Sequence, residues 1–398
     1  MRILMISPYL PWPLYGGASV RMFNIIKELT QRGHRIVLVA GERKTQPSSD
    51  NISYELCENI YLYELPSIGR LRSIILSLFS RQPYPALQFQ NKQLSEIVGN
   101  LLKKEQFDLI WLNFLFMTNV LSKIIRRNTS IILDQNEADE LIWQRYIKNG
   151  SFAQKIFSYL NLKKVQFLQN KAFKYIDVLL CVSEKEAEFM KSRVPQKTRI
   201  FVVPNGVDID FFQPKTEVNA QKPIILMTGG MSVFRNIDAA LWFGKNIFPR
   251  VKKAIPKAEF WVVGSSPDKK VFDLKAIPGV VVTGTVEDIR PYYQKAKVYV
   301  APFRFGEGTR LKVLEAMAMK VSIVSTKMGC QGIDVINGHH VLIAESEDEF
   351  SKRVIELLGN PQKRKELAEA SRKLIEEKYS WGKIVENLEL KLQKLVRE

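Results

Sequence analysis

The sequence is poor in histidine and in cysteine, with only three of each among 398 residues. The cysteines lie far apart, so they predict neither a disulfide framework nor a zinc site, and we expect three buried thiols. No two histidines have the spacing of a metal-binding pair, and no Gly-x-Ser-x-Gly motif occurs. Metalloenzyme and serine hydrolase functions therefore lack support, and we expect no bound metal.

The chain also lacks a long hydrophobic run. The longest apolar stretch, residues 109–125, is interrupted by Asn113, Asn119 and Lys123. It falls short of the roughly 20 apolar residues that a spanning helix needs. The apolar run at the start of the chain is too short for a signal peptide and indicates a buried strand. We therefore expect a cytoplasmic protein.

Acidic residues are missing from two long segments, residues 65–95 and 141–176. The whole chain has 59 lysines and arginines against 41 acidic residues, which gives a formal net charge of +18. Within both segments basic side chains are interleaved with large apolar ones, as at Arg72, Ile75 and Phe79. This pattern predicts an anionic partner: a membrane surface, a nucleic acid or a phosphorylated substrate. The alternative is a chain that is merely basic throughout.

Short apolar strands alternate with helical patterns in both halves of the chain. The predicted strands are residues 3–7, 36–40, 60–65, 109–112, 131–134, 178–182, 200–203, 224–228, 259–263, 280–283, 298–301, 322–325 and 341–343. The predicted helices are residues 20–32, 94–104, 151–175, 184–193, 237–255, 286–295, 310–319, 347–358, 361–378 and 382–398. Such alternation is typical of doubly wound α/β domains with parallel sheets, and a turn-rich junction near Pro204 predicts two of them. A ligand cleft is expected at the carboxyl ends of the strands.

Glycine-rich loops follow several of the predicted strands. Gly16-Gly17 precedes a helix in the first half, and Gly229-Gly230, Gly264 and Gly284 follow strands in the second half. Glycine lets a phosphate approach the backbone, and helix N–H groups then face it. Neither a P-loop nor the dinucleotide-binding pattern is present. Each loop alone could be a plain turn, but several in one domain predict a shared ligand-binding edge.

A charged segment in the second half carries Glu307 and Glu315, with Arg310 and Lys312 between them. If a helix starts near Thr309, it completes roughly 1.7 turns by Glu315 at ~3.6 residues per turn. The two cations would then lie at its amino end, where anions are favoured. Carboxylates for hydroxyls and cations for phosphates suit a sugar nucleotide. The alternative is a solvated, charged helix start.

Taken in order, these motifs resemble the retaining, GT-B-fold glycosyltransferases of family 4, the group 1 transferases. The resemblance rests above all on the segment from Glu307 to Ala318 and on Pro204-Asn205-Gly206-Val207-Asp208. It implies two Rossmann-like domains facing across a cleft. Residues 1–205 would bind the acceptor, and residues 206–379 would bind the nucleotide-sugar donor. A final helix, residues 380–398, would cross back onto the first domain.

The resemblance also implies roles for single residues. Glu307 would face the hydroxyls of the donor sugar, and Glu315 would accept hydrogen bonds from the ribose. Arg310 and Lys312 would neutralise the diphosphate and, with Glu307, act in catalysis. Related proteins use an Arg and a Lys after the first strand of the second domain, where this chain offers only Arg235. The remaining residues expected to bind the donor are Gly17, Gly230, Gly264, Thr285, Val286, Gly308 and Thr309.

The implied reaction is loss of a nucleoside diphosphate from C1 of the sugar and attack by an acceptor hydroxyl, with retention at the anomeric carbon. Fixed cations and N–H groups would stabilise the charge on the leaving phosphate, which would itself serve as the base. No cofactor is expected, and a UDP- or GDP-sugar is the favoured donor substrate. Many relatives carry a histidine after the fifth strand. Here Gln135 or Asn136 stands there, and an amide cannot act as acid or base.

Two other functions remain open. A sugar-nucleotide epimerase of the same fold would need protein acid and base groups, which the scarcity of histidine argues against. A nucleic-acid-binding protein would explain the net charge, but no recognised nucleic-acid module is present. The expected partners are therefore a nucleotide sugar, a glycan or lipid-linked acceptor and an anionic membrane surface, and not a nucleic acid. The sequence does not predict the oligomeric state.

Overall fold

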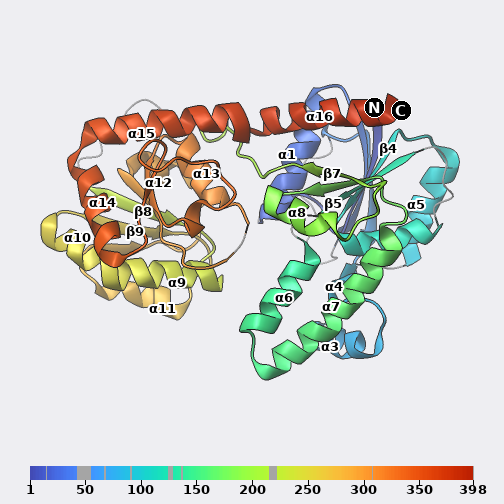
Figure 1. Ribbon diagram of the computed structural model, residues 1–398, viewed down its shortest axis with the longest axis horizontal. Coiled ribbons are helices and arrows are strands. Elements are labelled where there is room, and N and C mark those ends of the chain that lie inside the picture. The colour runs from blue at the N-terminus through green and yellow to red at the C-terminus, as the bar shows by residue number, and fades with distance from the viewer. Residues whose placement is uncertain are drawn as a thin grey trace. The chain divides into compact units, whose positions relative to one another are not determined.

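The computed structural model describes residues 1–14, 16–42, 55–66, 69–89, 92–123, 129–135, 138–214, 222–306 and 308–397. They form two compact units. The first consists of Met1–Pro204 and Val385–Glu398, and the second of Asn205–Ile384. Each unit is an α/β domain on one parallel sheet (Figure 1), which confirms the predicted fold class.

The first unit contains a seven-stranded sheet in the order β3-β2-β1-β4-β5-β6-β7. Its strands are β1 (Arg2–Ser7), β2 (Arg35–Glu42), β3 (Asn59–Glu64), β4 (Leu109–Asn113), β5 (Ser130–Asp134), β6 (Val178–Cys181) and β7 (Arg199–Val202). Its helices are α1 (Gly17–Gln31), α3 (Arg70–Phe79), α4 (Tyr84–Phe89), α5 (Lys92–Lys104), a 3-10 helix (Leu115–Lys123), α6 (Asp139–Asn149), α7 (Phe152–Ala172) and α8 (Glu184–Lys191). The central strands are continuous apolar runs because a parallel sheet is buried on both faces.

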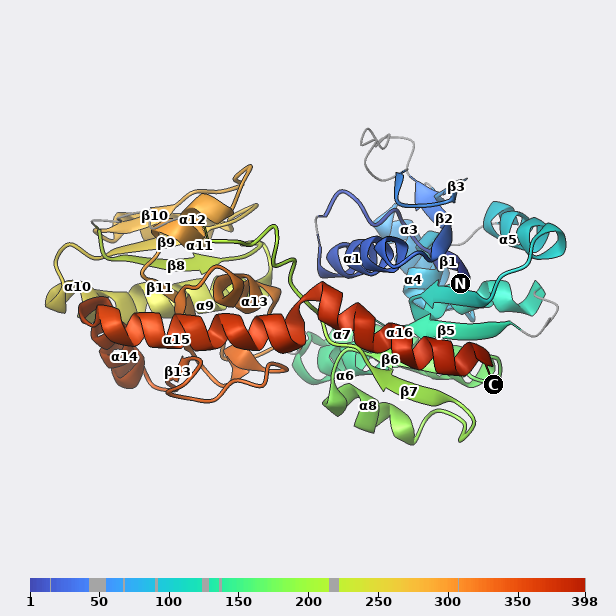
Figure 2. The same ribbon diagram turned by 90° about the horizontal axis from the view of Figure 1, so that it is seen from above.

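The second unit contains a six-stranded sheet in the order β10-β9-β8-β11-β12-β13, which can be followed in Figure 2. Its strands are β8 (Ile224–Thr228), β9 (Glu259–Val263), β10 (Val280–Val282), β11 (Val298–Ala301), β12 (Ser322–Ser325) and β13 (Leu342–Ile343). Its α-helices are α9 (Phe234–Trp242), α10 (Phe248–Ala254), α11 (Lys269–Phe272), α12 (Arg290–Lys295), α13 (Leu311–Ala318), α14 (Glu347–Gly359) and α15 (Pro361–Leu374). Shorter elements are π-helices at Phe243–Ile247 and Ile375–Tyr379 and 3-10 helices at Asp273–Ala276 and Met328–Cys330.

The last helix, α16 (Trp381–Arg397), begins in the second unit and ends in the first. Its Glu389 carboxylate lies 2.9 Å from His34 Nε2 and 3.5 Å from Arg32 Nη1. His34 Nδ1 in turn lies 3.0 Å from the amino group of Met1. These contacts tie the carboxyl-terminal part of α16 to the first strand and first helix of the first unit.

The order of the strands reverses between β1 and β4 in the first sheet and between β8 and β11 in the second. Ligands of open parallel sheets bind at the carboxyl ends of the strands where the order reverses. In the second unit, this position is flanked by the loop after β8, with Gly229-Gly230, and by the loop after β11, which leads to α13. The topology therefore makes these two loops the expected ligand-binding position of the second unit.

All the predicted strands are present, but some helices differ from the prediction. The sequence did not predict α3, α4, α6 or α11. The helix predicted at residues 286–295 begins only at Arg290, which is a correction that leaves Val286 in a loop. Asp288 Oδ1 accepts a hydrogen bond from the amide of Arg290 (2.9 Å), and Pro291 follows in the first turn, so the helix starts there.

The three cysteines are buried free thiols, as expected. Burial raises the pKa of Cys57 to about 12 and that of Cys330 to about 11, so both are unreactive near neutral pH. Within the described ranges, no helix combines the length and the apolar character that crossing a membrane would require.

Candidate functional site

Three loops that follow neighbouring strands of the second sheet are hydrogen-bonded to one another. The amide of Gly229 donates to the carbonyl of Val263 (3.1 Å), and that of Gly264 donates to the carbonyl of Gly284 (3.2 Å). A Cβ on Gly264 would lie 1.8 Å from the carbonyl oxygen of Gly229, so only glycine fits there. The loops of Gly230, Gly264 and Gly284 thus form one continuous edge, as the sequence predicted.

The Glu315 carboxylate, on the second turn of α13, is almost fully buried and is held from two sides. Tyr293 of α12 donates a hydrogen bond from its hydroxyl to Oε2 (3.0 Å), and Lys312 Nζ lies 2.8 Å from Oε1. Burial, with a smaller effect from Glu315, raises the pKa of Tyr293 well above its ordinary value, so the phenol keeps its proton. Thr228, at the end of β8, lies 2.8 Å from the same hydroxyl. The carboxylate is therefore fixed in place.

Lys312 differs from Glu315 in its exposure to solvent. Its side chain is 41% exposed, against 11% for that of Glu315. Lys312 can therefore leave the ion pair for an anion from solution, while the Glu315 carboxylate keeps its hydrogen bond from Tyr293. A flexible lysine beside a fixed carboxylate suits a ligand that carries both an anion and hydroxyl groups.

Two arginines approach each other at Gly306, in the loop after β11. Arg310 is 6% exposed, its guanidinium lies 4.9 Å from the centre of the Phe303 ring, and it donates to the carbonyl of Phe305 (3.4 Å). A Cβ on Gly306 would lie 2.8 Å from Arg310 Nη2 and 3.1 Å from Cδ of Arg235. Arg235 itself is exposed on the first turn of α9. The structure thus places side-chain atoms of both arginines beside Gly306.

The residues between Gly306 and Arg310 are only partly described. Glu307, the residue predicted to face the donor sugar, lies outside the described residues. Gly308 has φ of 85°, a conformation that favours glycine. The hydroxyl of Thr309 is buried and has no hydrogen-bond partner among the described residues. A buried hydroxyl of this kind is a candidate ligand contact.

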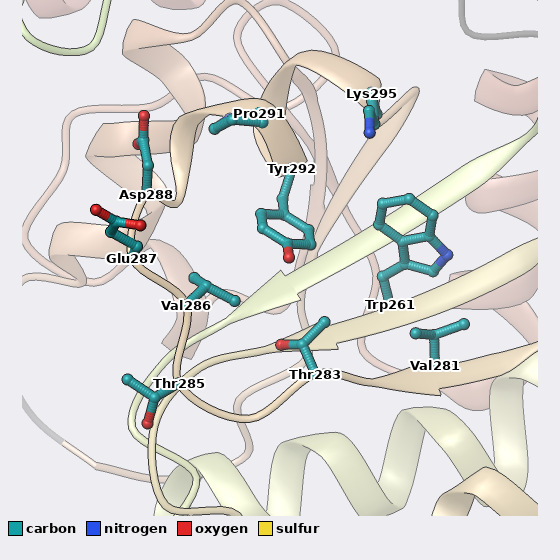
Figure 3. A pocket seen from close by; sticks show the side chains of 10 residues that line it. All are labelled: Trp261, Val281, Thr283, Thr285, Val286, Glu287, Asp288, Pro291, Tyr292 and Lys295. Carbon is teal, nitrogen blue, oxygen red and sulfur yellow. The ribbon is translucent and has the colours of Figure 1, made fainter.

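A pocket of about 700 Å³ lies beside β10 and α12. Thr285 and Val286, the residues predicted to lie near the base of the donor, stand at one end of it, while Trp261 and Lys295 stand at the other (Figure 3). The Trp261 ring packs edge-on against Tyr292 at 5.9 Å between ring centres and gives the pocket an aromatic wall. Because Thr285 follows the Gly284 that bonds to Gly264, the pocket adjoins the glycine loops.

In the first unit, Gly17 is the exposed first residue of α1. One turn later, the fully buried Arg21 forms an ion pair with Asp134 at the end of β5 (3.0 Å) and donates to the carbonyl of Val203 (2.8 Å). The neighbouring Gln135 is also buried, and its side-chain amide has no hydrogen-bond partner among the described residues. Asn136 lies outside them.

The sequence analysis missed several of these contacts. Tyr293 and Thr228 carry no sequence signal, because a single tyrosine in a helix or threonine in a strand is indistinguishable from a residue that serves packing alone. Arg21 and Asp134 are 113 residues apart, and only the fold brings them together. The structure places the predicted residues of the second unit that it describes, which exclude Glu307, around one edge of its sheet, whereas Gly17 belongs to the first unit.

The comparisons with known proteins define the class of the chain. Residues 15–211 match the family described as Glycosyltransferase Family 4, and residues 222–360 match the family described as Glycosyl transferases group 1. Together the two matches cover most of both units. The chain therefore belongs to the group 1 glycosyltransferases and has the GT-B fold of two Rossmann-like domains.

Individual relatives are distant but cover nearly the whole chain. An uncharacterized 44.6 kDa protein in the cps region of Klebsiella pneumoniae is 21% identical over 97% of this chain and 98% of its own length. The N,N'-diacetylbacillosaminyl-diphospho-undecaprenol alpha-1,3-N-acetylgalactosaminyltransferase of Campylobacter jejuni is 25% identical over 89% of this chain and 90% of its own. The Anabaena protein HepE, solved in complex with UDP-glucose, aligns with a TM-score of 0.67 and 14% identity over 99% of this chain and 100% of its own.

Proposed function

We propose that the protein transfers a sugar from a nucleotide-sugar donor to a hydroxyl of a lipid-linked, polysaccharide or other glycan acceptor, with retention at the anomeric carbon. The observation that carries this proposal is the Glu315 carboxylate, fixed by Tyr293 and paired with Lys312, at the sheet edge that also holds the glycine loops. Two relatives support it. The Anabaena structure holds UDP-glucose, and the name of the Campylobacter enzyme includes a diphospho-undecaprenol-linked substrate.

The donor would bind across the point where the strand order reverses. Glu315 would accept hydrogen bonds from the ribose hydroxyls, because its carboxylate is fixed and points to the same edge as the glycine loops. Lys312 would leave Glu315 for the diphosphate, since its side chain is flexible and half exposed. Arg235 and Arg310, on either side of Gly306, would complete the neutralisation of the diphosphate.

The base of the donor would occupy the end of the pocket at Thr285 and Val286, with UDP and GDP as the favoured nucleotides. Gly230 and Gly264 would let the diphosphate approach the backbone, with Gly308 and Thr309 on the other side of it. Glu307 would hold the hydroxyls of the sugar, and Gly17 would border the acceptor or the diphosphate from the first unit.

In the proposed step, the bond between C1 of the sugar and the phosphate oxygen breaks as the acceptor oxygen attacks C1 from the same face. The proton of the acceptor hydroxyl passes to the departing phosphate oxygen, so no protein base is required. Arg310, Lys312 and Arg235 would stabilise the negative charge that develops on that oxygen. These cations would therefore act on turnover as well as on binding.

The test is a thermal-shift comparison of UDP-, GDP- and ADP-sugars, followed by a transfer assay with a donor labelled in the sugar. We expect one nucleotide class to stabilise the protein and the label to move to the acceptor with release of nucleoside diphosphate. Glu307→Ala should mainly lower kcat. Label that stays on the nucleotide as an epimerised sugar would overturn the proposal in favour of an epimerase.

We also propose peripheral association with a membrane.

A further inference from the structure

Helix α3 buries its small polar side chains and exposes its large apolar ones. Ser73 and Ser77 are fully buried, whereas Leu71 is 73% exposed, Ile75 is 50% exposed and Phe79 is 88% exposed. The exposed residues recur every four positions and thus form one stripe along the helix. A surface helix of a water-soluble domain normally has the opposite pattern, with its apolar stripe against the core. The outward stripe of α3 therefore needs an explanation.

Helix α7 buries an ordinary apolar face, with Leu162, Val165 and Leu168 in the core, but it also carries an apolar stripe on its outer side. Its Ser158 and Asn161 are buried, while Phe152 is 82% exposed, Ile156 is 50% exposed and Phe167 is 60% exposed. Phe152, Ile156 and Phe167 also lie on one side of the helix, because they are spaced by four and by eleven residues. Two helices of one unit thus turn apolar stripes to the outside.

Hydrogen bonds join α7 to α3 and to the start of α4. Asn161 Oδ1 of α7 accepts hydrogen bonds from the amide of Tyr84 (2.8 Å) and from Ser77 Oγ of α3 (3.4 Å). Lys164 of α7 donates from Nζ to the carbonyl of Ser77. The two helices are thus packed against the rest of the unit. The exposure of their apolar side chains does not result from detachment of a helix from the core. A few polar groups of the two helices meet at this contact, and the apolar stripes remain outside.

The charge around both stripes has one sign. Residues 65–95 and 141–176 contain no acidic residue. Exposed Arg72 accompanies the stripe of α3, and exposed Lys155 and Lys163 accompany that of α7. A partner must therefore be apolar and anionic at once. Nucleic acid would match the charge but not the leucine and phenylalanine side chains, and a second copy of the chain would bring like charges together.

We propose that the α3–α7 surface, defined by the stripes of Leu71, Ile75 and Phe79 and of Phe152, Ile156 and Phe167, docks on an anionic lipid bilayer. The apolar side chains enter the boundary between headgroups and acyl chains, and the flanking lysines and arginines bind anionic headgroups. This inference identifies the surface and the lipid class behind the peripheral association, and it does not depend on the transfer reaction.

Vesicle flotation of the full chain tests the proposal. Vesicles of phosphatidylcholine alone are compared with vesicles that also contain phosphatidylglycerol, at low and high salt. The parental protein should float with the anionic vesicles, and less so at high salt. The variant Leu71→Gln/Phe79→Gln/Phe152→Gln should partition at least about tenfold less. The variant Lys155→Glu/Lys163→Glu should lose its preference for phosphatidylglycerol.

A matched control changes exposed apolar residues elsewhere. Phe272→Gln/Ile336→Gln replaces side chains that are 50% and 60% exposed in the second unit, and it should float like the parent. Thermal unfolding of all variants should stay near the parental midpoint, because the changed side chains are exposed. Transfer to a water-soluble acceptor should also be unchanged, so failed docking and failed catalysis are separate readouts.

Three results would overturn the proposal. The first is equal flotation with and without phosphatidylglycerol, and the second is an equal loss of flotation in the control. The third is a parental dimer in size-exclusion chromatography that the apolar variant converts to a monomer, which would assign the surface to self-association.

Discussion

Replacing Gly306 with alanine should disable the donor site without removing any group that contacts the donor. The added Cβ would lie 2.8 Å from Arg310 Nη2 and 3.1 Å from Cδ of Arg235. Favourable contacts between nonbonded carbon atoms need about 3.5–4.0 Å, so both side chains have to retreat by roughly 0.5 Å or more. Because both arginines are proposed to hold the diphosphate, one methyl group would disturb both side chains at once.

The size of the effect follows from the strength of charged hydrogen bonds. Such a bond contributes about 1.5–3 kcal/mol, so losing one lowers kcat/KM roughly 10- to 150-fold. Gly306 also has φ of 105°, where an alanine costs about 1–2 kcal/mol. In a unit of this size that cost lowers the Tm by roughly 2–8 °C. Steady-state kinetics with the donor identified above, together with thermal unfolding, measures both quantities.

A second glycine provides a control with the same backbone strain. Gly338 has φ of 81°, and a Cβ there would have no heavy atom within 4 Å. Gly338→Ala should therefore lower the Tm by a similar amount and leave kcat/KM near the parental value. If Gly306→Ala matched this control in both measurements, the two arginines would not hold the diphosphate. In the Gly306→Ala background, Arg235→Ala should add little further loss, because that arginine is already displaced.

Three further predictions concern the two buried networks. Glu315→Ala and Lys312→Ala should each weaken donor binding about tenfold or more in calorimetric titration, and unchanged affinity in both variants would refute the site assignment. Tyr293→Phe should lower the free energy of unfolding and that of donor binding by about 1.5–3 kcal/mol in total, because Glu315 loses a hydrogen bond. A variant with the parental Tm and the parental donor affinity would contradict this. Arg21→Met should cost about 3–5 kcal/mol in urea unfolding, since Asp134 stays buried without its partner, and adding Asp134→Leu should recover most of that loss.

The strands were predictable because burial on both faces leaves a direct trace in the sequence. Residues 224–228 and 298–301 are uninterrupted or nearly uninterrupted apolar runs, and both match β8 and β11 in full. The predicted start of α12 was wrong. The side chain of Asp288 and the following Pro291 set the start of the helix four residues later than the apolar pattern indicates. Strand prediction depends on composition, whereas helix starts depend on single capping contacts.

The site was predictable where glycine marks it and unpredictable where tertiary packing makes it. Gly264 is required because its backbone touches the Gly229 loop, and a glycine after a strand is visible in the sequence. The support of Glu315 is not, because Tyr293 comes from another helix and resembles a core residue. Likewise, the sequence predicts Arg310 as a phosphate-binding cation at a helix start, with a solvated cation as the alternative, but it does not predict that Arg310 stacks on Phe303 and is buried.

The failure to predict α3 has a physical cause that bears on function. An amphipathic pattern assigns a helix by assuming that its apolar stripe faces a core and its polar side faces water. In α3 the serines face the protein and the apolar residues face outward, so the stripe carries no information about the core. Sequence rules that agree with one another elsewhere in a chain tend to fail at sites shaped by function. For α3, the assumption that fails is that the surroundings are water, and a bilayer whose anionic headgroups meet the adjacent basic side chains of α3 and α7 is the environment in which the same pattern is stable.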